Sequence, residues 1–160
     1  MAGDGDVDAA KKLGVQLGCS SQMSVLGWVE VEEVDRLLAE SDVLVLPSHA
    51  EGLAAALVQA MSWGLAVVTT DVGGAGEFLE HGRNSILVKA GDVRGISNAI
   101  RELAVNPALR LRLGLAARDT MSRFSIDTYI VTLTELYEEL ASGSPRRRGE
   151  SSTIAALHKS

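Results

Sequence analysis

A short polar loop in the middle of the chain has the residue types of a ligand site. It contains Ser48, His49, Glu51 and Gly52, and it follows the apolar run of residues 43–46 (VLVL). A carboxylate such as Glu51 accepts hydrogen bonds from hydroxyl groups, and a glycine lets a ligand approach the backbone closely. Where a helix begins, free backbone N–H groups suit an anionic or hydroxyl-rich ligand. The alternative is that the glycine only forms a turn and that Glu51 only stabilises a helix start, and spacing alone favours neither.

A second glycine-containing loop follows the next apolar run of the chain. Gly73 and Gly74 come shortly after residues 66–70 (AVVTT), and residues 53–63 between the two runs are rich in the helix formers Ala, Leu and Met. Strand, helix and strand in this order predict a right-handed βαβ unit with its functional loops at the carboxyl edge of a parallel sheet. We therefore expect both loops at the same edge.

The rest of the chain alternates between helical and strand patterns. We expect further strands at residues 23–29 and 85–88, and helices at residues 7–17, 31–40, 93–105, 107–123 and 126–140. This alternation predicts an α/β fold, a Rossmann-like parallel sheet with flanking helices. We expect one domain over residues 1–142 and a flexible tail over residues 143–160, which is rich in Gly, Ser and Arg.

Composition and charge exclude several classes of function. The net charge of −6 and an aromatic content of 4% argue against a nucleic-acid partner, which requires clustered cations or stacking platforms. No apolar run reaches the length of a membrane span, and residues 1–6 lack the features of a signal peptide. The single cysteine fits a reducing compartment, so we expect a cytoplasmic protein. The histidines and the cysteine have no metal-ligand spacing, so we expect no metal site.

The motifs together resemble the carboxy-terminal, donor-binding domain of retaining glycosyltransferases with the GT-B architecture, in glycosyltransferase family 4 (group 1). The resemblance runs from about residue 2 to residue 137. It rests on residues 47–52 (PSHAEG), 59–68 (QAMSWGLAVV), 73–77 (GGAGE) and 81–92 (HGRNSILVKAGD). Each motif is weak by itself, and together they form a specific pattern.

The resemblance implies that the domain binds a nucleotide-diphosphate sugar, without a cofactor or metal, for transfer of the sugar with retention at the anomeric carbon. It implies that Glu51 is the catalytic position beside the donor sugar and that position 59 binds the ribose. It also implies donor contacts by further residues, namely Ser48, His49, Gly52, Leu53, Ala54, Gly73, Gly74, Gly5 and Trp28. Trp28 lies in the region that recognises the base in that family, although its residue type also suits a packing role.

The sequence departs from the family pattern at single positions. Position 59 is Gln59 instead of a glutamate, and an amide lacks the charge that strengthens a hydrogen bond to ribose. Ala54 stands where a second glycine is common.

A larger departure is what the chain lacks: the first strand with its basic phosphate-binding loop, most of the second strand, and the amino-terminal acceptor domain. We therefore expect the isolated chain not to transfer sugar. In the usual strand order 3-2-1-4-5-6, the strands near Val25 and Val45 would flank a gap, which favours a homo-oligomer, possibly strand-exchanged. The alternative function is a non-catalytic oligomerising or partner-binding module derived from the same fold.

Overall fold

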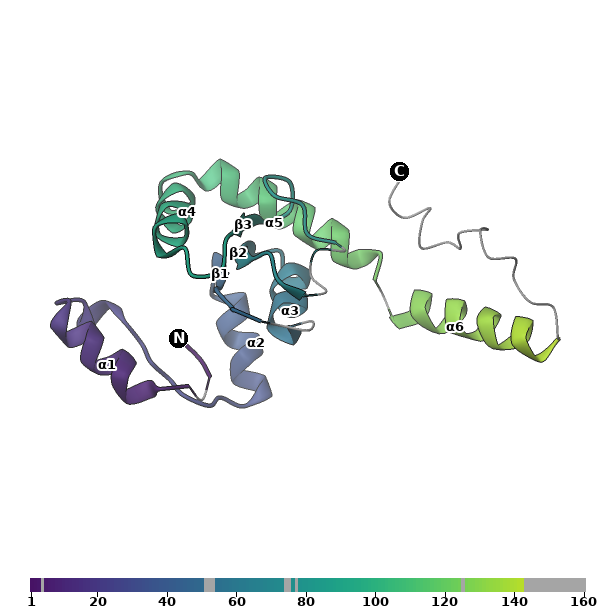
Figure 1. Cartoon of the computed structure of the whole chain (residues 1–160), viewed down its shortest axis with the longest axis horizontal. Helices are drawn as coiled ribbons and strands as arrows, with labels where there is room; N and C mark the ends of the chain where they lie inside the picture. Colours follow the sequence, from purple (N-terminus) through teal and green to yellow (C-terminus); the bar gives the residue numbers. More distant parts are fainter. Residues whose placement is uncertain (4, 51–53, 74–75, 77, 125, 143–160) are drawn as a thin grey trace. The chain divides into compact units, whose positions relative to one another are not determined.

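The computed structural model describes residues 1–3, 5–50, 54–73, 76, 78–124 and 126–142. Its internal contacts divide the chain into two compact units, Met1–Ser41 and Asp42–Ser160, which are described separately below. Residues 143–160, for which the sequence predicts a flexible tail, lie outside the described residues. Figure 1 labels the helices and strands of both units.

The amino-terminal unit is helical. It contains α1 (Val7–Gln16), the short 3-10 helix η1 (Ser20–Gln22) and α2 (Val31–Ala39). Asp6 caps α1, since its Oδ1 accepts a hydrogen bond from the Ala9 N–H at 2.9 Å. The helices expected at residues 7–17 and 31–40 are confirmed, and each ends one residue earlier than expected.

The strand expected at residues 23–29 is wrong. This segment forms only an isolated parallel bridge between Ala2 and Gly27, with the Gly3 N–H donating to the Gly27 carbonyl at 2.7 Å. A strand needs a neighbour of comparable length to build a ladder, and residues 1–3 offer it only a few backbone groups.

The carboxy-terminal unit contains a parallel sheet of three strands. The strands are β1 (Val43–Leu46), β2 (Ala66–Thr70) and β3 (Ile86–Val88), in the order β1-β2-β3. Helix α3 (Ala55–Trp63) connects β1 to β2 and ends at Gly64, whose positive φ of 81° closes the helix. The expected βαβ unit is thus confirmed, with parallel pairing of β1 to β2 and of β2 to β3.

Strand β2 is the centre of the core, and all its residues are buried. Val67 packs on one face of the sheet with Leu57 and Met61 of α3. Val68 packs on the other face with Ala99 and Leu103 of α4 (Val93–Val105). Alternate residues of β2 point to opposite faces, so a run that is apolar throughout indicates a sheet covered by helices on both sides. Figure 1 shows α3 and α4 on either side of the strands.

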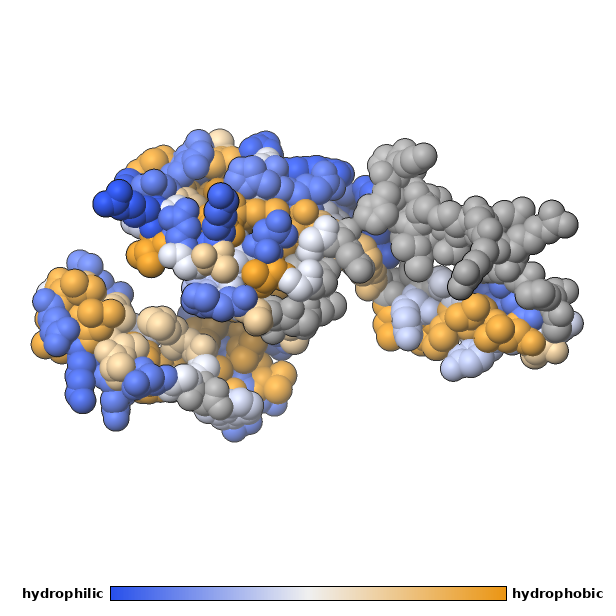
Figure 2. Space-filling view, in the orientation of Figure 1, coloured by the Kyte–Doolittle hydropathy of each residue, from blue (hydrophilic) through white to orange (hydrophobic). Residues whose placement is uncertain are grey.

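Two further helices belong to the described part of the carboxy-terminal unit. Helix α5 (Pro107–Ser122) contributes Leu113 to one apolar cluster and Ala117 and Met121 to the other. Helix α6 (Ile126–Ala141) carries several exposed large hydrophobic residues: Ile126, Tyr129, Ile130, Val131, Leu136, Tyr137 and Leu140. Figure 2 shows hydrophobic surface, in orange, along this helix. No helix in the described ranges is both long and apolar enough to cross a bilayer.

Candidate functional site

A cavity lies at the carboxyl edge of the sheet, where the sequence predicts a ligand site. It has a volume of ≈ 10 Å³, about the room that one water molecule needs, and lies where β1 and β2 end and α3 begins. Its lining residues are Leu46, Ser48, Ala54, Leu57, Thr69, Thr70 and Val72. The carboxyl edge of an open parallel sheet is the usual place for a ligand, because strand ends and helix starts meet there. Ser48 and Ala54, two of the predicted site residues, line this cavity.

Two buried threonines at the end of β2 fix the backbone where it leaves β1. The Thr70 hydroxyl donates to the Ser48 carbonyl at 2.5 Å, and the Thr69 hydroxyl donates to the Leu46 carbonyl at 3.0 Å. A buried hydroxyl requires a partner, and here both partners belong to the neighbouring strand and its loop. No sequence motif singled out these two threonines. Their position at the end of a buried strand was the available signal.

His49 lies at the same edge, and the loop after β3 comes close to its side chain. Its side chain is exposed, and a Cβ added to Gly91 would lie 3.9 Å from His49 Nε2. Gly91 has a positive φ of 79°, which a glycine adopts without strain. The loop between β3 and α4 therefore borders the site, and sequence spacing did not indicate this.

The remaining predicted residues have different places. Gln59 is exposed on α3 and does not line the cavity, and Gly73 is exposed just beyond Val72. Glu51, Gly52, Leu53 and Gly74 lie outside the described residues.

Gly5 and Trp28 belong to the amino-terminal unit. Gly5 borders a separate cavity of ≈ 180 Å³ there, together with Gly3 and Val25 among others. Trp28 is 73% exposed, because no neighbour among the described residues of its unit covers the indole ring. The alternative packing role for this side chain is therefore wrong for that part of the chain.

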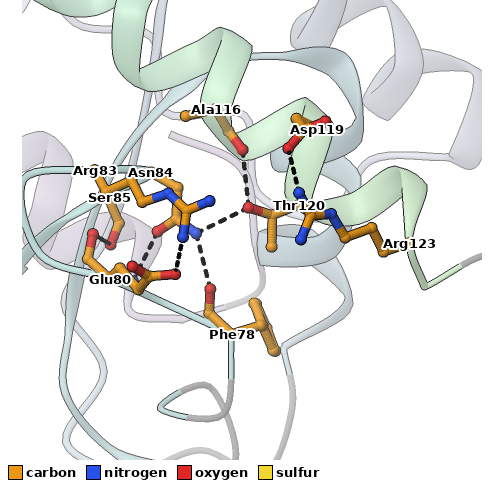
Figure 3. Close-up of polar contacts among 9 residues, drawn as sticks. All are labelled: Phe78, Glu80, Arg83, Asn84, Ser85, Ala116, Asp119, Thr120 and Arg123. Carbon is orange, nitrogen blue, oxygen red and sulfur yellow. Dashed lines mark hydrogen bonds and ion pairs between the residues drawn. The ribbon is translucent and has the colours of Figure 1, made fainter. Parts of the chain in front are cut away.

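The segment that follows the second glycine loop is held by a buried asparagine. Asn84 is fully buried, and its Nδ2 donates to the Phe78 carbonyl at 2.8 Å and to Thr120 Oγ1 at 3.0 Å. Its Oδ1 accepts from the Glu80 N–H at 2.8 Å. Figure 3 shows this side chain between residues 78–80 and helix α5. Among the described residues, no three His, Cys, Asp or Glu side chains gather as a metal site would require.

Comparison with known proteins gives a consistent result. Residues 1–106 match the family model described as glycosyl transferases group 1. The lipopolysaccharide core biosynthesis glycosyltransferase LpsE of Rhizobium meliloti is 30% identical over 147 residues, which cover 91% of this chain and 42% of LpsE.

Solved structures of GT-B glycosyltransferases share the fold. The crystal structure of Anabaena HepE in complex with UDP-glucose is 26% identical with a TM-score of 0.72, over 88% of this chain and 40% of HepE. Sucrose-phosphate synthase from Thermosynechococcus elongatus is 22% identical with a TM-score of 0.75, over 86% of this chain and 35% of that chain. The chain thus spans less than half the length of each of these proteins.

Proposed function

Since the chain belongs to the group 1 glycosyl transferases, we propose that it is the part of such an enzyme that binds a nucleotide-diphosphate sugar. One observation carries this proposal: the small cavity at the carboxyl edge is lined by Ser48, which belongs to the motif of residues 47–52, and by Ala54, which follows that motif. The complex of HepE with UDP-glucose supports the choice of ligand class, because HepE shares the fold and 26% of the aligned residues.

The proposal assigns a role to each part of the site. Glu51 lies beside the donor sugar as the catalytic group, and the backbone N–H groups of residues 52–54 bind the sugar or the phosphates. Gln59 binds the ribose hydroxyls, and the loop with Gly73 and Gly74 approaches the donor from β2. His49 contacts the donor from the end of β1. The sugar is transferred with retention, by a family 4 enzyme and without a metal ion.

We propose further that this chain alone transfers no sugar. Catalysis of this kind depends on charge stabilisation and positioning in a closed cleft, to which an amino-terminal acceptor domain contributes. Turnover by the purified chain with a panel of nucleotide sugars would contradict the proposed inactivity.

We also propose a cytoplasmic location, because a single cysteine suits a reducing compartment.

A second candidate is a non-catalytic module that associates through the same fold. Gln59 favours it, because an amide replaces the carboxylate that the family pattern has at the ribose position. The β1 edge of the sheet also favours it, since β1 pairs only with β2 among the described residues. An apolar strand edge without a charged residue is a template for pairing with another chain.

Calorimetric titration of the chain with UDP, GDP and their sugars separates the two candidates. Saturable binding that is lost in Glu51→Ala supports the donor site. The matched control is Glu102→Ala, which removes an exposed carboxylate from α4 and should leave the affinity unchanged. Absence of binding at millimolar nucleotide would exclude the donor site and leave the non-catalytic module.

A further inference from the structure

We propose that Lys89, at the end of β3, binds the diphosphate of the nucleotide sugar. This inference rests on the proposed function and deepens it, because the family resemblance gives Lys89 no role. Three loops follow the strands of the sheet, at residues 47–54, 71–78 and 89–92, and Lys89 is the only Lys or Arg that the sequence has in them. A diphosphate is an anion, so a cation of the same sheet edge would form charge-assisted hydrogen bonds with it.

The register of the sheet places Lys89 next to the wall of the cavity. Val88, the last residue of β3, is the register partner of Thr70, which lines the cavity. The Asp71 N–H donates to the Val88 carbonyl at 3.3 Å, so the pairing of β2 with β3 continues to this end. Neighbouring strands lie about 4.8 Å apart. Lys89 therefore starts about one strand spacing from the end of β2, and a flexible four-carbon stem carries its ammonium group.

The alternation of side chains along β3 places Lys89 on the face of the sheet that holds the cavity. Leu87 packs against the apolar cluster of Leu57, a residue of α3 that lines the cavity. Val88 packs against the cluster of Ala99, on the α4 face. Since successive side chains point to opposite faces, the next residue, Lys89, lies on the α3 face with Leu87. Lys89 and the cavity therefore share both an edge and a face of the sheet.

The turn after β3 leaves the ammonium group available for a ligand. The Asp92 N–H donates to the Lys89 carbonyl at 3.0 Å, so the chain turns directly after β3. The Asp92 carboxylate is the nearest acidic group in sequence, and its Oδ1 accepts from the Gly95 N–H at 2.9 Å as the cap of α4. Lys89 is exposed and takes part in none of the ion pairs of the described residues.

The same turn comes close to the loop after β1. A Cβ added to Gly91 would lie 3.9 Å from His49 Nε2, so the loops that carry Lys89 and His49 approach each other at this edge. Asp71 follows Thr70 at the end of β2 and is the acidic residue beside them. Lys89 is thus the full positive charge that these three strand ends offer, and Asp71 opposes it.

The test measures the Kd of the chain for UDP by calorimetry. We expect Lys89→Ala to raise Kd about threefold to tenfold, because an exposed ion pair with the ligand is lost. Lys89→Arg keeps the charge and should bind UDP like the wild type. Lys12→Ala, which removes an exposed lysine of α1, is the matched control and should leave Kd unchanged. At about 1 M salt, where screening is nearly complete, wild type and Lys89→Ala should bind UDP alike.

A second charge variant tests the same assignment from the other side. Asp71→Asn removes the carboxylate beside Lys89, so Kd for UDP should fall about twofold to threefold. The exposed Lys89 side chain makes an unchanged Tm the expectation for its variants.

Two results overturn the role of Lys89 and leave the donor site intact. One is an unchanged Kd in Lys89→Ala while the wild type binds UDP. The other is a raised Kd that Lys89→Arg does not restore and that persists at high salt, because the loss would then not depend on charge. Absence of UDP and UDP-glucose binding by the wild-type chain overturns the proposed function, and the role of Lys89 with it.

Discussion

The hydroxyl of Thr70 connects β2 to the loop that carries the site motif. Thr70→Val keeps the shape of the side chain and leaves the Ser48 carbonyl without this donor. We expect the free energy of unfolding to fall by about 1 kcal/mol, because a partly buried acceptor loses a hydrogen bond and the buried Thr70 side chain loses its polar contact. Urea unfolding measures this change. Thr134→Val on the exposed surface of α6 is the matched control, and an equal effect of the two variants would contradict the role of the Thr70 hydroxyl.

At position 59, an amide in place of a carboxylate bears on the choice between the two candidate functions. Gln59→Glu restores a carboxylate, which forms a charge-assisted hydrogen bond to ribose hydroxyls. We expect the affinity for UDP to rise about threefold to tenfold, measured by calorimetry. Gln16→Glu on α1 introduces the same charge at another exposed position and should have no effect. An unchanged or weaker affinity of Gln59→Glu would exclude Gln59 as the ribose-binding residue.

At the residue scale, the sequence predicted the loop and missed its supports. Ser48 and Ala54 were predicted and line the cavity, because motif and strand end coincide at β1. Thr69, Thr70 and Gly91 were missed, since their partners are 22 or more residues away and depend on the order of the strands. Tertiary partners of this kind have no local signature.

At the scale of elements, α5 crosses the turn between α3 and β2 at very short distance. A Cβ added to Gly114 would lie 2.0 Å from the Gly64 carbonyl oxygen, which no side chain tolerates without a shift of the backbone. We expect Gly114→Ala to destabilise the fold by at least about 2 kcal/mol in urea unfolding, because overpacking forces helix and turn apart. Leu115→Ala, next to it and exposed, should change stability by about 0.5 kcal/mol or less.

Helix α2 carries an arginine that forms ion pairs with two glutamates on the same helix. Arg36 hydrogen-bonds Glu33 and Glu40, and the bond to Arg36 lowers the pKa of Glu33 below its ordinary value of 4.5. A lowered folded-state pKa stabilises the helix at pH values above the unfolded-state pKa, and this support disappears as the pH falls through the folded-state pKa. We expect Arg36→Gln to reduce the loss of helical circular dichroism between pH 5 and pH 3. Identical acid titrations of variant and wild type would contradict this.

Most elements could be predicted because their signals are local. The apolar runs of β1 and β2 and the Asp92 cap before α4 fix these boundaries, and the Asp92 Oδ1 does accept from the Gly95 N–H at 2.9 Å. The strand at residues 23–29 failed because pairing is not local. Its pattern is that of a strand, but residues 1–3 give it one bridge and no ladder.

At the scale of the whole molecule, the β1 edge predicts self-association. Residues 43–46 are apolar, and the strand carries neither a charge nor a proline that would protect an edge. We expect sedimentation velocity to show concentration-dependent oligomers that persist at high salt, because backbone pairing and apolar contact do not depend on ionic attraction. A single monomeric species at high concentration would contradict this prediction.

The central claim is that the carboxyl edge of the sheet binds a nucleotide-diphosphate sugar, and NMR of the isotope-labelled chain with UDP-sugar tests it most directly. We predict saturable shifts of backbone amide resonances around the cavity, at Ser48, Thr70, Val72 and Gly91. Resonances of α4 residues such as Ala99, on the far side of β2, should stay unchanged. Unchanged spectra at millimolar ligand, or shifts confined to helices away from this edge, would contradict the claim.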